Sequence, residues 1–131
     1  MAKILDTHAL ITYLEKEPGY EIIAKLFREA SERRENLLMT LINYGEAYST
    51  TLAEYGQEQA AELEKYMPTF PIDIVDVDWQ LAKEAARLKA AYKMSYTNCF
   101  AAALAKLLES ELITGDPEFK PLENEIKISW I

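Results

Sequence analysis

Three acidic residues occupy positions from which they could act together, although they lie far apart in the sequence. Asp6 ends a short apolar segment, and Asp116 follows another at Glu111–Thr114. Glu46 lies about two helical turns beyond a third such segment, Leu37–Thr40. In an open parallel sheet the carboxyl ends of the strands share one edge, and ligands bind in the crevice there. We therefore expect the three carboxylates to converge at that edge.

Carboxylates brought together in this way repel one another unless protons or cations neutralise them, and a divalent metal ion is the expected solution. The chain has one histidine, His8, and one cysteine, Cys99, so it offers no ligand set of the kind that binds zinc. Oxygen ligands favour Mg²⁺ or Mn²⁺. These ions suit phosphodiester cleavage because they lower the pKa of water and stabilise the charge that develops on the phosphate.

The segments that would position these acids are short apolar runs of the length typical of buried strands. Helical patterns separate them, and strands that alternate with helices pair in parallel through right-handed crossovers. The sequence therefore predicts an α/β fold, a three-layer α/β/α sandwich with a parallel sheet of four or five strands. The predicted strands are residues 3–6, 37–40, 72–75 and 111–114, with 126–131 as a possible edge strand.

The predicted helices begin and end at capping and breaking residues. Pro18 and Gly19 end the first helix, and Gly56 separates the third from the fourth. Asp78 is a plausible N-cap for a long helix that we expect to end near Met94. The helices are expected at residues 7–14, 22–34, 41–55, 58–67, 79–94 and 97–108.

Length and composition limit the class of protein. A chain of 131 residues with 50% hydrophobic content suits a single domain, which we expect to span residues 1–131. The net charge of −8 argues against a protein that binds nucleic acid through its overall charge. The apolar stretches are far shorter than the ~20 residues of a membrane span. A lone cysteine cannot form an internal disulfide, so we expect a cytoplasmic protein without membrane attachment.

Four segments in order carry a resemblance to a known family: "ILDTHALITYL", "LINYGEAY", "MSYTNCFAAALA" and "LITGDPEFK". Together they resemble the PIN-domain family, and especially the VapC-type toxins of VapBC toxin–antitoxin pairs. The resemblance implies that Asp6, Glu46 and Asp116 are catalytic acids that bind Mg²⁺ or Mn²⁺. It also implies that Thr114 orients the ligands or water from behind them.

The same resemblance implies an activity and partners. The expected protein is a metal-dependent endoribonuclease, the toxin of a type II toxin–antitoxin system, which cleaves an RNA substrate. It would form a homodimer and bind a small antitoxin through a basic C-terminal segment of that partner. Tyr44, Tyr48 and Tyr55 cluster on one predicted helix, and we expect Tyr44 and Tyr48 to line the antitoxin groove, because aromatic anchors often mark such grooves.

Asn98 departs from the family pattern, which has an aspartate at the start of the alanine-rich helix. Asn98 belongs to the predicted catalytic and metal-binding set, but it lacks a negative charge and brings N–H donors that cannot bind a metal. We therefore expect weakened or abolished activity. Two origins for Asn98 stay open: a natural sequence with reduced activity, or an introduced change that lets a growth-inhibiting nuclease be expressed.

Two other classes of function were weighed against this interpretation. A catalytically silent PIN domain could act as a binding module for RNA or protein, and Asn98 motivates that alternative. A phosphoacceptor or phosphatase on a related α/β fold also places an acid after its first strand, but that pattern needs a second acid where this chain has His8. We interpret His8 as structural.

Overall fold

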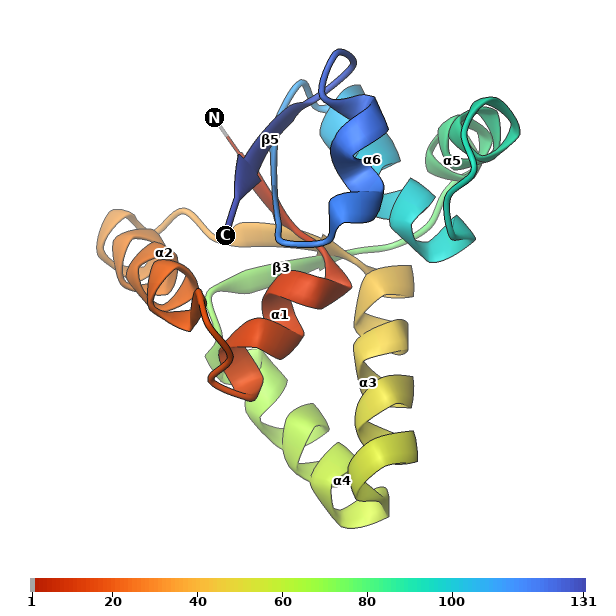
Figure 1. Ribbon diagram of the computed structural model, residues 1–131. Coiled ribbons are helices and arrows are strands. Elements are labelled where there is room, and N and C mark those ends of the chain that lie inside the picture. The colour runs from red at the N-terminus through yellow and green to blue at the C-terminus, as the bar shows by residue number, and fades with distance from the viewer. Residues whose placement is uncertain (1) are drawn as a thin grey trace.

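A computed structural model describes residues 2–131 and has a five-stranded parallel sheet at its centre (Figure 1). The strand order is β3-β2-β1-β4-β5, and every neighbouring pair is parallel. The prediction of a parallel sheet of four or five strands, including the edge strand near the C-terminus, is confirmed. The strands are β1 (Lys3–Leu5), β2 (Leu37–Thr40), β3 (Ile72–Val75), β4 (Glu111–Thr114) and β5 (Lys127–Trp130).

Each central strand sends alternate side chains to opposite faces of the sheet, and each face carries its own apolar core. Ile4 and Leu112 pair across β1 and β4 and belong to the core under the two helices α5 and α6. Leu5 and Ile113, the next pair, belong to the core under α1 and α2. Helices therefore cover both faces, and the three-layer arrangement is confirmed (Figure 1).

Side-chain caps fix where four of the helices begin, and all four caps follow the same rule. Asp6, Thr40, Asp78 and Ser95 each accept a hydrogen bond from a backbone N–H of the first turn. Asp6 directly follows β1 and Thr40 is the last residue of β2, so α1 and α3 start at the carboxyl edge of the sheet. The helices are α1 (Thr7–Leu14), α2 (Tyr20–Arg33), α3 (Leu41–Tyr55), α4 (Gln57–Tyr66), α5 (Trp79–Ala91) and α6 (Tyr96–Leu107).

Two details of the predicted helices need correction. Helix α5 ends at Ala91 rather than near Met94, because Tyr92 adopts an extended backbone and Lys89 Nζ donates to the carbonyl of Met94. Two 3-10 helices, η1 (Met67–Thr69) and η2 (Pro117–Leu122), lie where the sequence suggested only breaks. The second of them proves important for the site.

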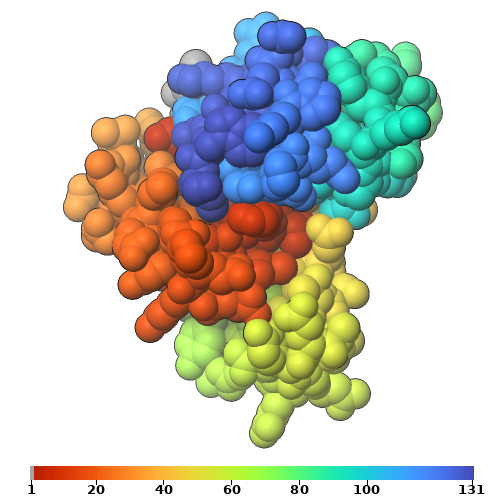
Figure 2. Space-filling model, in the orientation of Figure 1, coloured from red at the N-terminus to blue at the C-terminus, as the bar shows by residue number. Residues whose placement is uncertain are grey.

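Helices α3 and α4 form a hairpin that projects from the rest of the molecule (Figure 2). The turn between them is made by Gly56, whose φ of 91° lies in the left-handed region that favours glycine. Within residues 2–131, no helix has the length and apolar character needed to cross a membrane.

Candidate active site

Asp6 lies directly after β1 and is fully buried. Its Oδ1 accepts the N–H of Ala9 at 2.8 Å, so the carboxyl group caps α1, and its Oδ2 accepts the hydroxyl of Thr114. Burial raises the pKa of Asp6 from 3.8 to about 7, although both hydrogen bonds act to lower it. The nearby carboxylates of Asp116 and Glu46 raise the pKa further, and no cation contributes.

Thr114, the last residue of β4, connects two of the predicted acids. Its hydroxyl donates to Asp6 and accepts the backbone N–H of Asp116 at 3.0 Å. Asp116 in turn caps η2, because its Oδ1 accepts the N–H of Glu118 at 2.9 Å. The fully buried Thr114 therefore fixes both acids relative to the end of the sheet.

Asn98 lies in the first turn of α6 and presents its amide nitrogen to the acids. Its Nδ2 donates to Asp116 Oδ2 at 3.1 Å and to Glu118 Oε1 at 2.8 Å. The two N–H bonds of the amide are thus both used on carboxylates. Asn98 therefore donates hydrogen bonds to Asp116 and Glu118 and accepts none from them.

Glu46, half-buried on α3, is the acid held least firmly. Glu46 accepts no hydrogen bond from residues 2–131. Its carboxylate lies close enough to Asp6 to raise the pKa of Asp6. Asp6, Glu46, Asn98 and Asp116 therefore gather at the carboxyl edge of the sheet, as predicted. We call these four residues, together with Glu118, the acidic site.

Asn43 is a buried residue that sequence reasoning missed. Its backbone N–H donates to Thr40 at 3.0 Å, and its Nδ2 donates to Thr7 Oγ1 at 3.2 Å and to the carbonyl of Thr97 at 3.4 Å. Thr7 and Thr97 are the neighbours of Asp6 and Asn98. Asn43 thus joins the three helices that carry Asp6, Glu46 and Asn98. A polar residue three positions after a threonine N-cap is the only signal of this role in the sequence.

Glu118 was also missed. Its Oε1 accepts the N–H of Ser95 at 2.8 Å as well as the amide of Asn98. The sequence showed Glu118 only as part of a turn after Asp116, and its contact with Ser95 depends on the course of η2. His8, the sole histidine, is exposed, and its Nδ1 lies 3.4 Å from Thr12 Oγ1 on the same helix.

The donor chemistry of the acidic site fits a hard divalent cation, since carboxylate oxygens come from four elements around one edge. Within residues 2–131, however, no three His, Cys, Asp or Glu side chains are arranged to hold a metal ion. Among the described residues, burial and the neighbouring acids raise the pKa of Asp6 to about 7, more than the hydrogen bonds from Thr114 and Ala9 lower it.

A separate apolar groove lies between α1, α3 and α4. It has a volume of about 500 Å³, and its walls include Leu14, Tyr55, Leu63, Tyr66 and Phe70. Tyr44 and Tyr48 are partly buried against the core under α1 and α2, and neither belongs to the walls of this groove. Tyr55, from the same helix, does line it. That Tyr44 and Tyr48 line an antitoxin groove stays a prediction.

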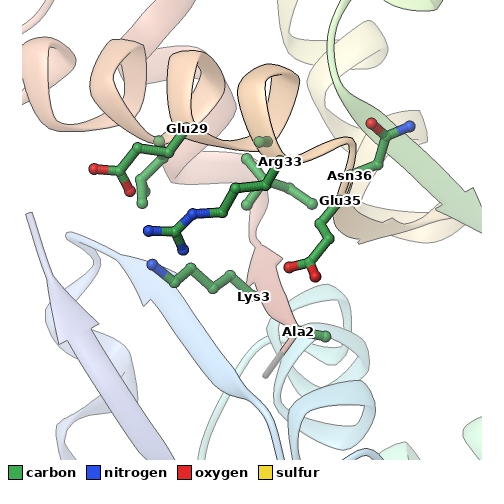
Figure 3. Close-up of a pocket in the computed structure, with 9 residues that line it drawn as sticks. Ala2, Lys3, Glu29, Arg33, Glu35 and Asn36 are labelled. Carbon is green, nitrogen blue, oxygen red and sulfur yellow. The ribbon is translucent and has the colours of Figure 1, made fainter.

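The opposite end of the sheet has a cavity of different character. It has a volume of about 320 Å³ at the start of β1 and the end of α2. Lys3 and Arg33 extend in the same direction there, and Glu29 and Glu35 belong to the same walls (Figure 3). Cations and acids are therefore both present at this end, whereas the acidic site has carboxylates alone.

Residues 3–124 match the family model described as the PIN domain, and the chain belongs to this family. Two relatives are each 28% identical over 127 residues, covering 89% of this chain and 92% of their own length. They are ribonuclease VapC30 of Mycobacterium tuberculosis and VapC ribonuclease Mb0640 of Mycobacterium bovis.

Solved structures with the same fold come from toxin–antitoxin complexes. VapBC2 of Rickettsia felis, bound to a promoter DNA fragment, contains a chain that matches with a TM-score of 0.77 at 14% identity, covering 100% of this chain and 99% of that one. VapBC-1 of nontypeable Haemophilus influenzae matches with a TM-score of 0.73 at 17% identity, covering 99% and 98%. These likenesses establish the PIN-like fold.

Proposed function

We propose that this protein is a metal-dependent endoribonuclease and the toxin of a type II toxin–antitoxin pair. The observation that carries the proposal is the gathering of Asp6, Glu46 and Asp116 at the carboxyl edge of the sheet, with Asp6 fully buried and held by Ala9 and Thr114. Such a site is costly to the fold and is typical of functional positions. Membership of the PIN family and the ribonuclease relatives support the choice of RNA as substrate.

Asp6, Glu46 and Asp116 would hold Mg²⁺ or Mn²⁺, with Asn98 in the place of a fourth ligand. The bound ion would supply a Lewis acid that lowers the pKa of water and stabilises charge on the phosphate. Thr114 keeps Asp6 and Asp116 in a fixed relation. The protein accordingly brings acids to one edge, and a bound ion would offset their repulsion of the RNA phosphate.

Asn98 is expected to reduce activity, because its amide N–H groups face Asp116 and Glu118 instead of an oxygen facing a cation. We expect Asn98→Asp to strengthen Mn²⁺ binding and to raise the single-turnover rate of RNA cleavage. Calorimetry with MnCl₂ and a cleavage assay measure the two effects. Equal affinity and equal rate for both forms would remove Asn98 from the proposed ligand set.

A catalytically silent PIN domain that binds RNA or protein is the second candidate, and the orientation of the Asn98 amide favours it. The cleavage assay separates the two candidates. If Asp6→Asn has the same background rate as the parent chain and Asn98→Asp gains nothing, while RNA is still retained in a filter-binding assay, the silent module is the better description.

For partners, we propose a homodimer and a small antitoxin whose basic C-terminal segment reaches the acidic site. The complexes in which the fold recurs support this partner class. The groove of Tyr55 and Tyr66 also has acidic walls at Glu15 and Glu62, and the chain carries a net charge of −8, so it suits a basic, partly apolar peptide. Sedimentation at micromolar concentration tests the dimer, and a monomer there would contradict it.

A further inference from the structure

The imidazole of His8 lies against the turn that carries Asp116. A Cβ atom on Gly115 would stand 2.6 Å from Cε1 and 3.1 Å from Nδ1 of the ring, so the ring occupies the space that a side chain at position 115 would need. Gly115 does not have a positive φ, and its backbone therefore permits other residues. The ring of His8 explains why position 115 has no side chain.

This contact places the imidazole beside the acidic site. Gly115 joins Thr114 to Asp116 in the chain. The hydroxyl of Thr114 donates to Asp6, and His8 follows Asp6 by two positions in the first turn of α1. The side chain of His8 is nevertheless exposed. The ring therefore lies at the solvent-facing border of the site, where a molecule bound at the acids can reach it.

The buried Thr12 determines which ring nitrogen carries the hydrogen. Thr12 Oγ1 lies 3.4 Å from His8 Nδ1 and has no other hydrogen-bond partner among the described residues. A buried hydroxyl without an acceptor is costly, so the hydroxyl donates and Nδ1 accepts. The hydrogen of the neutral ring then lies on Nε2. Nε2 has no hydrogen-bond partner in residues 2–131, and its N–H is available to a ligand.

A donor in this place meets a specific need of the site. Asp6, Glu46 and Asp116 repel an approaching phosphate. The two amide N–H groups of Asn98 already donate to carboxylates. Uncharged donors contact phosphate oxygens in nucleic-acid complexes as charged ones do. The Nε2–H group of His8 can therefore bind a phosphate oxygen without bringing another cation to the acids.

We propose that His8 binds the RNA substrate, with its Nε2–H donating to a phosphate oxygen of the strand next to the acids. This inference rests on the proposed function, since RNA is the substrate proposed there. It gives the ring of His8 a role in substrate binding besides its packing against Gly115.

The test is the binding of a fluorescein-labelled single-stranded RNA of random sequence to the full chain, measured by anisotropy in EDTA and in MnCl₂. His8→Ala removes the donor, and we expect the Kd for RNA to rise about fivefold. A glutamine can place an amide N–H near the position of Nε2–H, so His8→Gln should stay within about twofold of the parent chain. Equal losses in His8→Ala and His8→Gln would show that the ring only packs.

Gly115→Ala tests the same contact from the other side. The added Cβ displaces the ring, and the Kd for RNA should again rise about fivefold. In the double variant His8→Ala, Gly115→Ala the ring is already absent, so the second substitution should add nothing. Gly45→Ala is the matched control, because its Cβ would meet no atom within 4 Å, and it should bind RNA as the parent chain does. Thermal unfolding shows whether each variant is folded.

Cleavage of the same RNA with MnCl₂ distinguishes this inference from the proposed function. If the parent chain cleaves RNA and His8→Ala binds and cleaves it equally well, the role of His8 is overturned and the proposed function stands. If neither the parent chain nor Asn98→Asp cleaves RNA, the proposed function fails, and the binding measurements still decide the role of His8. A parent chain that binds no RNA overturns the inference. A fivefold loss in His8→Ala that His8→Gln avoids is the expected result.

Discussion

The acidic site and the surface cluster around Glu125 place carboxylates in opposite environments. At the surface, the hydrogen bond from the Tyr92 hydroxyl, followed by that from Arg87, lowers the pKa of Glu125 from 4.5 to about 2. Arg87 Nη2 lies 2.9 Å and Lys106 Nζ 3.4 Å from Glu125 Oε1. At the acidic site, burial and neighbouring acids raise the pKa of Asp6 to about 7.

The difference shows that residues 2–131 have cations to pair with carboxylates and place none of them beside Asp6. Even the cavity at the other end of the sheet combines Lys3 and Arg33 with acids (Figure 3). Unpaired acids at one edge destabilise the fold, and a bound divalent cation would reverse that effect. The comparison supports the proposal that function shapes the acidic site, whereas the paired charges of the Glu125 cluster stabilise the fold.

The largest effect should come from Asp6→Asn. If Asp6 binds the catalytic metal, RNA cleavage should fall on the order of 10²-fold or more. The same substitution should raise the free energy of unfolding relative to the parent chain. Because the folded pKa of about 7 exceeds the unfolded 3.8, the folded state binds more protons between these values, and stability falls as pH rises from about 4 through about 7.

That difference in pKa corresponds to a loss of ~4 kcal/mol in the free energy of unfolding at pH 8. Asp6→Asn should not show this fall in stability with pH. Chemical denaturation at pH 4 to 8 measures it for both proteins. The variant should gain on the parent chain as pH rises. A pH dependence that is the same in both proteins would mean that Asp6 is not the buried acid responsible.

A smaller effect is expected when Thr114 loses its hydroxyl. Thr114→Val leaves Asp6 Oδ2 and the N–H of Asp116 without their buried partner, which should cost about 1 to 3 kcal/mol. The pKa of Asp6 should rise further, because the lost hydrogen bond favoured the charged form. The pH profiles of stability and cleavage should shift upward together, and Thr114→Ser should behave like the parent chain.

The smallest effect belongs to Glu125→Gln. Partly exposed ion pairs contribute about 1 kcal/mol or less, so the loss at pH 7 should lie in that range and diminish at high salt. The pKa of Glu125 is lowered, so its contribution is present above the unfolded pKa of 4.5 and is lost as pH falls toward about 2. RNA cleavage at pH 7 should be unchanged. A large loss of RNA cleavage would contradict the view that the Glu125 cluster affects stability and not the acidic site.

The sequence predicted the fold because the strands are short apolar runs bounded by strong capping and breaking residues. Asp78 shows how local this signal is: its side chain accepts the N–H of Leu81 at 2.8 Å, three residues on, as expected of an N-cap. The gathering of Asp6, Glu46 and Asp116 was predictable for a similar reason, since the ends of parallel strands meet at one edge.

What the sequence could not supply depends on contacts between distant segments. The contact of Glu118 with Ser95 joins residues that lie 23 positions apart. Asn43 contacts Thr7 and Thr97, 36 and 54 positions away. Helical spacing also does not decide which tyrosines of α3 turn toward the core. Tyr44 and Tyr48 pack against it, whereas Tyr55 is exposed and lines the groove between α1, α3 and α4.

The most direct test of the central claim, that the unpaired acids form a divalent metal site, is unfolding with and without MnCl₂ at pH 6 and pH 8. At a Mn²⁺ concentration about tenfold above Kd, the parent chain should gain ~1.4 kcal/mol. The gain should be larger at pH 8, where Asp6 is charged, and absent in Asp6→Asn. No stabilisation by Mn²⁺, or equal stabilisation of both proteins at both pH values, would contradict the account.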